Sequence, residues 1–378
     1  MVDVYVAGVA QVRFGRTPER SLEGMGQQAT LAAMRDAGVD KAAIDEVFCG
    51  NVLGGMLVGQ RVLRDLGMTG GPISNVEAAC SSGSLALREA YWALQSGRAE
   101  TILVVGVEKM SVLGGGPLPL ETTDIEVSQG QVMPAVYAMR ARRYMLETGA
   151  TETDLGMIAV KARANGALNP VAHFQKAVPL EEVLGSRMVA DPLRLNMCCP
   201  TSDGGAAVVL TTRKPQNGKC PIRIAGTALQ SGLYRTGPYD TSSADLTRRT
   251  SALAYEQAGV DPADVGLCEL HDAFAIAELM YYEALGLCPA GDGAKLLRSG
   301  ATQINGRLPV NPSGGLLSRG HALGATGLAQ VAEAVMHMRR EGGNRQVDAD
   351  VKVAVTHCTG GGISGVDHGA CAVTVLVR

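Results

Sequence analysis

Apolar and polar residues follow two alternating patterns along the chain, one typical of amphipathic helices and one typical of buried strands. A helical pattern over residues 26–37 precedes an apolar strand over Ile44–Cys49. In the second half of the chain, a helical pattern over residues 245–258 precedes a strand over Val265–Leu270. Because strands and helices alternate, the sequence predicts an α/β fold with a mostly parallel sheet covered by helices on both sides.

These two helix–strand units belong to an internal repeat. Residues 37–43 read AGVDKAA and residues 258–264 read AGVDPAD, at an offset of 258 − 37 = 221. Two further pairs keep the same order: the helices at 82–90 and 326–334, and the strands at 101–107 and 351–357. We therefore predict two similar halves that pack on each other through their helices.

The stretch between the halves differs from them in composition and in its pattern of elements. A glycine-rich loop at Gly114–Pro117 leads into Met- and Arg-containing helical segments at 133–148 and 152–165, which we interpret as a cap inserted over a site. The predicted domains are an N-terminal half, an inserted cap and a C-terminal half, formed by residues 1–113 plus about 190–216, about 114–189, and 217–378.

Composition narrows the classes of function. The formal net charge of −3 lacks the basic surplus of a nucleic-acid-binding protein. No apolar run reaches the roughly 18 residues of a membrane span, so we expect neither nucleic acid nor membrane as a partner. Nine cysteines without CxxC pairs argue against a disulfide framework and a zinc ribbon. We expect a cytoplasmic protein.

Cys80 is the first candidate for chemistry, because ligands of α/β sheets gather where strands lead into helices. A strand-like stretch at Ile73–Val76 precedes it, and a helix that ends at Gly97 follows. The positive end of a helix dipole favours a thiolate, and the small residues Ser81–Ser84 leave room for an acyl group. A buried structural cysteine is the alternative.

Three further turns carry reactive side chains. His321 lies among five glycines at 314–327 and could take the proton of Cys80 and hold the thiolate as an ion pair. His271, directly after the second-half strand, could donate an N–H to an oxyanion. Cys358 could shuttle a proton, and the glycines at 360–362 offer backbone N–H groups. A capping histidine or a buried thiol is the alternative in each case.

Taken together, these motifs resemble the thiolase superfamily. They are Cys80 in ACSSG, His271 in HDAF, His321 in GHALGATG and Cys358 in CTGGG. With VADPL at 189–193 and TSDG at 201–204, the chain is most similar to sterol-carrier-protein-like thiolases and to bacterial acetyl-CoA acetyltransferase-like proteins. The resemblance implies duplicated βαβαβαββ halves in a five-layer αβαβα arrangement. It also implies a homodimer or tetramer, acyl-CoA and coenzyme A as substrates, and neither a tightly bound cofactor nor a metal.

The resemblance also implies roles for the site residues. Cys80 would be acylated, His321 would activate it, and Cys358 would protonate or deprotonate the carbon nucleophile. His271 and His321 would form one oxyanion hole, and the backbone N–H groups of Cys80 and Gly360 would form the other. The implied reaction is the reversible Claisen condensation or thiolytic cleavage of a 3-ketoacyl-CoA by a ping-pong route.

Several positions depart from the family pattern. Ala322 replaces a common proline, and Ala273 stands where many sterol-carrier-like members have an acid/base cysteine, a role that falls here to Cys358. Cys199 occupies the place of a serine that often contacts pantetheine, so we assign it a contact with CoA. The ending at Gly362–Cys371 is longer than in ordinary thiolases, and it is associated with bacterial thiolase-like proteins that work with a small zinc-ribbon/OB-fold partner.

Three alternatives remain open at this point. The chain could be a thiolase-like aldolase, a condensing enzyme or subunit, or a catalytically silent scaffold for such a partner. The joint presence of Cys80, His321 and Cys358 argues against an aldolase, and the CTGGG turn argues against a condensing enzyme. A scaffold would show no reactive thiol.

Overall fold

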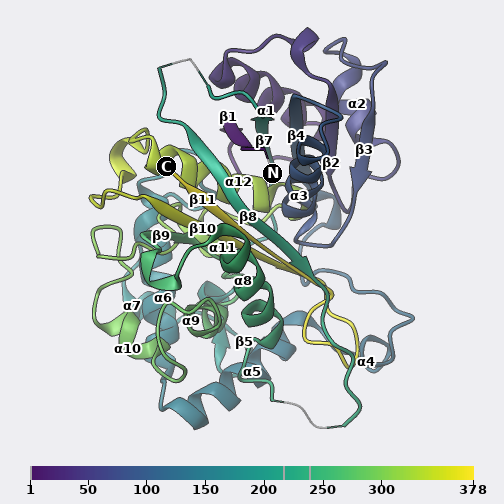
Figure 1. The fold of residues 1–378 in the computed structure, drawn as a ribbon. Helices are drawn as coiled ribbons and strands as arrows, with labels where there is room; N and C mark the ends of the chain where they lie inside the picture. The colour runs from purple at the N-terminus through teal and green to yellow at the C-terminus, as the bar shows by residue number, and fades with distance from the viewer. Residues whose placement is uncertain (1, 216–217, 238–239) are drawn as a thin grey trace.

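The computed structural model describes residues 2–215, 218–237 and 240–378 (Figure 1). The first half of the chain contains β1 (Tyr5–Gln11), α1 (Leu22–Ala37), β2 (Glu46–Gly50), α2 (Val58–Arg64), β3 (Ile73–Val76), α3 (Ser82–Gln95) and β4 (Thr101–Lys109). The cap contains α4 (Ile125–Ser128), α5 (Met133–Thr148), α6 (Glu152–Ala167), α7 (Leu180–Leu184), β5 (Met188–Ala190) and β6 (Leu193–Arg194). The remaining elements are β7 (Asp203–Thr211), β8 (Ile222–Gln230), α8 (Asp245–Ala258), β9 (Leu267–Glu269), α9 (Ala275–Ala284), α10 (Gly293–Arg298), α11 (Gly315–Ser318), α12 (Leu323–Met338), β10 (Val353–Gly360) and β11 (Ala370–Val377).

The strands repeat one order in the two halves, which confirms the predicted duplication. The sheet runs β3-β2-β4-β7-β1 and continues as β8-β11-β10-β9. A parallel bridge between Cys268 and Val310 stands where the third strand of the second half is expected. Within the described ranges, the two runs join through short pairing of β1 with β8 at Tyr5–Val6 and Ile222–Arg223.

The prediction of a mostly parallel sheet is wrong. Among the strands of the described residues, parallel pairing is confined to β2–β3, β2–β4 and β9–β10. The last strand of each half, β7 or β11, runs antiparallel to both of its neighbours. Strand β7 returns through the long cap, whereas β11 returns through the turn at 361–369. Neither connection is the right-handed helical crossover that a parallel strand requires.

The repeated AGVD motif forms the same helix ending twice. Gly38 after α1 and Gly259 after α8 both adopt left-handed backbone angles, with φ values of 69° and 64°. The N–H groups of Val39 and Val260 then bond back to the carbonyls of Met34 and Tyr255. Glycine is favoured there because it carries no Cβ penalty at positive φ. The sequence repeat therefore reflects a shared local structure.

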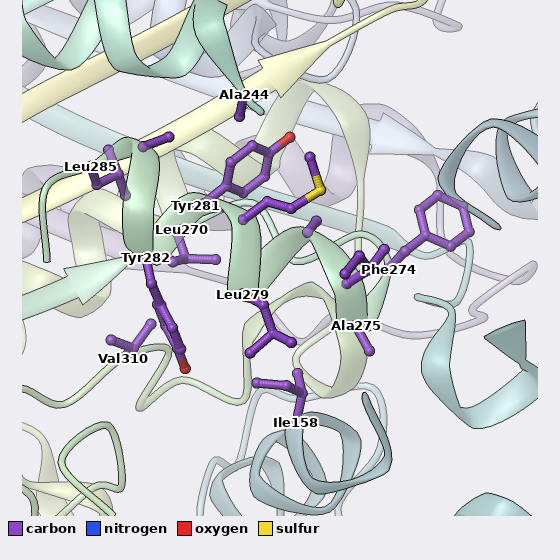
Figure 2. Packing of buried hydrophobic residues seen from close by; sticks show 14 of the residues in the cluster. Ile158, Ala244, Leu270, Phe274, Ala275, Leu279, Tyr281, Tyr282, Leu285 and Val310 are labelled. Atoms are coloured by element: carbon purple, nitrogen blue, oxygen red, sulfur yellow. The ribbon is translucent and has the colours of Figure 1, made fainter. Parts of the chain in front are cut away.

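Helices and sheets alternate in five layers. Helices α1 and α2 cover the outer face of the first run of strands, α8 contacts β8 and β11 of the second, and α3 and α12 pack together between them. Tyr281, Leu279 and Phe274 of the α9 region lie at the centre of the core formed with the cap (Figure 2). A Cβ at Gly83 or Gly106 would lie 2.6 or 2.2 Å from the carbonyl oxygen of Gly324. These glycines allow the start of α12 to approach α3 and β4 closely.

The predicted domain boundaries remain predictions, and the one at residues 216–217 lies outside the described residues. Among the described residues, none of the helices combines the length and the hydrophobicity that a membrane span requires.

Candidate active site

Cys80 lies in a tight turn between β3 and α3. Ala79 just before it has a positive φ of 49°, a conformation that a non-glycine residue adopts only when its surroundings hold it. The Ser82 hydroxyl accepts the N–H of Ala78 at 2.9 Å, and the Ser81 hydroxyl donates to the Cys358 carbonyl at 2.9 Å. The turn is therefore fixed both to its own helix and to the end of β10.

The structure brings together all four predicted catalytic side chains. The sulfur of Cys80 and one ring nitrogen each of His271 and His321 lie within 4.8 Å of one another. The Cys358 thiol donates to the Cys80 carbonyl at 3.0 Å and lies 3.2 Å from Nδ1 of His271. The two imidazole rings meet edge to face, with centroids 5.1 Å apart. Two thiols and two imidazoles from both halves thus surround one point.

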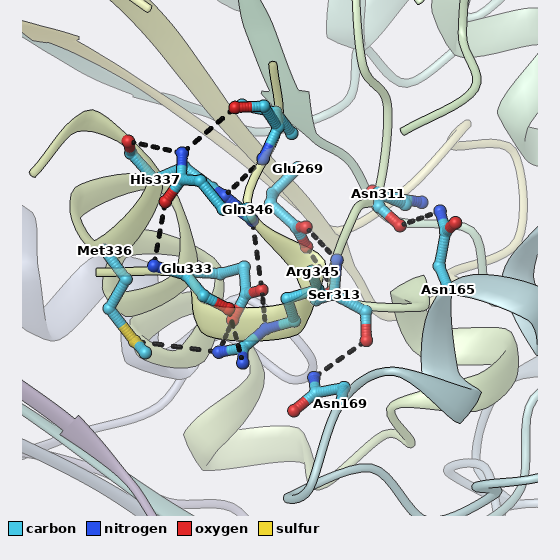
Figure 3. Close-up of polar contacts among 12 residues, drawn as sticks. Asn165, Asn169, Glu269, Asn311, Ser313, Glu333, Met336, His337, Arg345 and Gln346 are labelled. Carbon is cyan, nitrogen blue, oxygen red and sulfur yellow. Dashed lines mark hydrogen bonds and ion pairs between the residues drawn. The ribbon is translucent and has the colours of Figure 1, made fainter. Parts of the chain in front are cut away.

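Buried polar contacts fix the segment that leads to His321 (Figure 3). Glu269, two residues before His271, accepts hydrogen bonds from the backbone N–H and hydroxyl of Ser313 at 3.0 and 2.7 Å. From cap helix α6, Asn165 donates to the Asn311 carbonyl at 3.0 Å, and Asn169, just beyond its end, donates to the Ser313 carbonyl at 2.8 Å. The cap therefore braces the segment before His321 as well as covering the site.

Hydrogen bonds determine which nitrogen of His321 carries the proton. The Thr326 hydroxyl donates to the Ala322 carbonyl at 2.9 Å, so its oxygen accepts the Nδ1–H of His321 at 2.8 Å. Nε2 is buried and has no hydrogen-bond partner among the described residues. Burial, aided by the Arg319 guanidinium, lowers the pKa of His321 to about 3. His321 is therefore a neutral imidazole with a free lone pair on Nε2, as a general base requires.

The predicted ion pair between Cys80 and His321 is not the resting state. Burial raises the pKa of the Cys80 thiol to about 12, although the backbone N–H groups of Gly361 and Cys80 itself lower it in part. Burial also lowers the pKa of His271 well below its usual range and raises that of Cys358 well above it. The sequence suggested a helix dipole acting on Cys80, but desolvation of a buried thiol is the larger effect.

The alkylation rate of Cys80 should therefore depend steeply on pH. Below a pKa of about 12, the thiolate fraction rises tenfold per pH unit. We expect the iodoacetamide rate at Cys80, followed by peptide mass spectrometry, to rise about tenfold per unit between pH 7 and pH 9. A rate that is already constant near pH 7 would instead show a preformed thiolate.

The glycine-rich turn after β10 packs against the Cys80 turn and brings backbone N–H groups close to it. Gly360 packs so closely that a Cβ there would lie 2.4 Å from the Ala78 carbonyl oxygen. The predicted N–H donors are Cys80 and Gly360, and the structure adds Gly361, whose N–H interacts with the Cys80 sulfur. The oxyanion role of Gly360 stays a prediction.

A cavity of about 630 Å³ opens at these residues. Cys199 lines it, and its backbone N–H is bonded to the Ala273 carbonyl at 2.9 Å; its predicted contact with CoA stays a prediction. Apolar side chains form most of the wall: Met110, Leu118, Val132, Met133, Val189, Leu195, Phe274 and Leu323.

Two polar residues of the cavity wall were missed by the sequence analysis, Tyr137 of α5 and His368. Tyr137 lies in a segment predicted as a helix of the cap, and His368 lies in the long ending that was associated with a small partner protein; neither side chain was singled out. Arg187, an exposed cap residue at the same cavity, was also missed.

The cluster of Cys80, His271 and His321 also has the donor types of a metal site. The prediction that the chain needs no metal stays a prediction.

Comparison with known proteins places this site in a family. The model described as "Thiolase, N-terminal domain" matches residues 4–214, and "Thiolase C-terminal domain-like" matches residues 239–369. The chain belongs to the thiolase family, and it is an acyltransferase of that family. The predicted superfamily and fold class are thus confirmed.

Among particular relatives, the chain is 44% identical to the benzoylsuccinyl-CoA thiolase subunit BbsB of Thauera aromatica, over 95% of each chain. It is 40% identical to an acetyl-CoA acetyltransferase of Methanothermobacter thermautotrophicus over the full length of both. It is 36% identical to sterol carrier protein 2 of Bos taurus, over 98% of this chain and 72% of that protein. A solved structure titled "Ltp2-ChsH2(DUF35) aldolase" superimposes with a TM-score of 0.85 at 27% identity, over 100% of this chain and 98% of that one.

Proposed function

We propose that this chain cleaves or forms the C2–C3 bond of a 3-ketoacyl-CoA through an acyl group carried on Cys80. The observation that carries the proposal is the meeting of the Cys80 sulfur with the ring nitrogens of His271 and His321 within 4.8 Å. A second thiol, Cys358, lies one hydrogen bond from Cys80 and from His271. A nucleophile, its base and a separate acid are the groups that reversible carbon acyl transfer needs.

In the cleavage direction, the Cys80 sulfur attacks C3 and its proton passes to Nε2 of His321. The C2–C3 bond then breaks, and the Cys358 thiol gives its proton to C2, releasing the CoA thioester that contains C1 and C2 and leaving the shortened acyl group on Cys80. In the second half, the thiol of free CoA gives its proton to the Cys358 thiolate and attacks the acyl group. Cys80 leaves and takes back its proton from His321, so every proton is returned.

Oxyanions form in both halves of this reaction, on thioester and ketone oxygens. We assign one hole to His271 and His321 and the other to the N–H groups of Cys80 and Gly360, with Gly361 beside them. Preorganised donors of this kind contribute a large part of catalysis in a site that excludes water. Coenzyme A and acyl-CoA act as substrates, with no tightly held cofactor.

The tautomer of His321 gives a sharp test of its role as base. Thr326→Val keeps the shape of the side chain but cannot accept the Nδ1–H at 2.8 Å. We expect kcat/KM for thiolysis to fall roughly 10-fold to 100-fold, less than the full contribution of a general base because the imidazole itself remains. Thr326→Ser should recover most of the activity. Equal losses in both variants would indicate a packing role for Thr326.

For the assembly, we propose a cytoplasmic homodimer or tetramer that works with a small zinc-ribbon/OB-fold partner. Two comparisons support a partner: a relative is named as a subunit of a thiolase, and a structural neighbour is titled as a complex with a DUF35 protein. The relative's name also suggests an aryl-substituted ketoacyl-CoA as a candidate substrate. The apolar cavity of about 630 Å³ has room for such a group.

The decisive experiment is thiolysis of a panel of short, branched and aryl 3-ketoacyl-CoA thioesters, with and without a co-expressed partner. We expect CoA-dependent cleavage and a mass increase on Cys80 equal to the acyl group. An aldolase is the second candidate, because of the aldolase in the structural neighbour's title. It would cleave a hydroxyacyl substrate without CoA and without labelling Cys80. Absence of both reactions with the partner present would leave a scaffold.

A further inference from the structure

Away from the Cys80 group, one wall of the acyl cavity carries a connected polar cluster. The Tyr137 hydroxyl lies 2.8 Å from Nε2 of His368, and Nδ1 of His368 lies 3.0 Å from Oδ1 of Asp367. Asp367 in turn pairs with Arg140, which also donates to the Thr241 carbonyl at 3.2 Å. Tyr137 and His368 line the cavity, and their exposed fractions are only 2% and 4%.

Contacts with neighbouring core residues fix the position of this cluster. The Tyr137 ring stacks on Phe274 at a centroid distance of 4.5 Å, and its hydroxyl lies 3.4 Å from that of Tyr281. Burial would raise the pKa of Asp367, but His368 and Arg140 outweigh it and hold that pKa well below its usual range. Asp367 is therefore a carboxylate that accepts the Nδ1–H of His368. As a result, Nε2 and the Tyr137 hydroxyl are oriented toward each other at the cavity wall.

The position of the cluster favours a role in binding the substrate over a role in the bond-making steps. The bond-making groups are Cys80, His271, His321 and Cys358, and the mechanism above needs no proton from Tyr137 or His368. Most other lining side chains are apolar, so a charged group on the acyl chain would be desolvated there at a cost unless it found hydrogen-bond donors. The Tyr137 hydroxyl, held at the cavity wall by its 2.8 Å contact with Nε2 of His368, can supply such a donor.

We propose that Tyr137 and His368 form a recognition site for a carboxylate on the acyl chain of the substrate, an inference that rests on the proposed function. Arg140 and Asp367 cancel in charge, and a proton taken up on Nε2 of His368 would balance the charge of the bound carboxylate. In that state Nε2–H of His368 donates to the Tyr137 oxygen across their 2.8 Å contact, and the Tyr137 hydroxyl donates to the carboxylate. The substrate class is therefore a 3-ketoacyl-CoA with a carboxyl-bearing acyl chain.

Two unreactive CoA thioethers of equal chain length test this directly: S-butyl-CoA and S-(3-carboxypropyl)-CoA. Each is titrated against iodoacetamide alkylation of Cys80 in the full-length protein, with any partner present. A hydrogen bond to a charged group corresponds to roughly a 10-fold to 100-fold change in binding. We expect the carboxylate analogue to protect Cys80 at a concentration at least about tenfold lower. The Tyr137→Phe variant, which keeps the ring, should bring the two concentrations close together.

Tyr144→Phe is the matched control, since it removes a hydroxyl from the same helix that is bonded to Glu283. It should keep the wild-type preference. The inference is overturned if the wild-type protein binds both analogues equally or favours the butyl group, a comparison that needs no variant. It is also overturned if Tyr137→Phe weakens the binding of both analogues by the same factor, because that result indicates a merely structural role for Tyr137. Failure of the proposed function is read separately, because no acyl adduct would then form on Cys80 with any ketoacyl-CoA of the panel.

Discussion

Cys80→Ala is expected to lower kcat for thiolysis at least about 10³-fold, because it removes the atom that carries the acyl group. The change removes a single sulfur atom from a half-buried residue that lines the cavity, so the variant should fold and unfold like the wild type. The measurement is CoA-dependent cleavage of the best ketoacyl-CoA of the panel, together with a denaturation curve. His321 would remain, but with no thiol beside it.

Cys220→Ala is the matched control for that experiment. Cys220 is also a partly exposed free thiol, and it packs against the core cluster of α3 and α12 rather than lining the cavity. Its removal should leave thiolysis unchanged. If Cys80→Ala cleaved a ketoacyl-CoA as fast as wild type, the covalent route through Cys80 would be excluded.

The fold could be predicted from sequence because its local signals agree with one another. The AGVD motifs predicted two equivalent helix ends, and Gly38 and Gly259 indeed form the same left-handed caps. Strand direction could not be predicted in the same way. The reversal of β7 and β11 depends on how a long cap and a turn at 361–369 return the chain, and helix–strand alternation carries no information about either connection.

The site was predicted at the level of residue types rather than protonation states. The strand-to-helix turns and the thiolase resemblance indicated that Cys80, His271, His321 and Cys358 would meet, but the thiol and imidazole pKa values depend on burial that only the packed structure defines. Tyr137 and His368 were missed for a related reason. They lie 231 residues apart in the chain, and their contact across the cavity follows from the packing of α5 against the long turn.

Cys358→Ser should separate two steps that Cys80→Ala abolishes together. Serine keeps a donor near the Cys80 carbonyl, now 3.0 Å from the thiol, but its pKa is too high for proton exchange with carbon. We expect kcat for ketoacyl-CoA cleavage to fall at least about 10³-fold. Transfer of an acyl group from a simple acyl-CoA to Cys80 should persist, because the CoA thiolate that leaves in that step is a much weaker base than a carbanion and can leave without a proton from Cys358.

Intact-protein mass spectrometry detects the acyl adduct, and product formation measures cleavage, so one preparation of the variant yields both values. Loss of the adduct as well as of cleavage would mean that Cys358 supports the Cys80 turn through its hydrogen bond rather than acting on carbon. Retention of both would assign the acid to another group, and His271, 3.2 Å from the Cys358 sulfur, is the nearest candidate. Only the split result fits a thiol that donates its proton to C2, because carbon must be protonated when the carbon–carbon bond breaks, whereas the leaving CoA thiolate is stable without a proton.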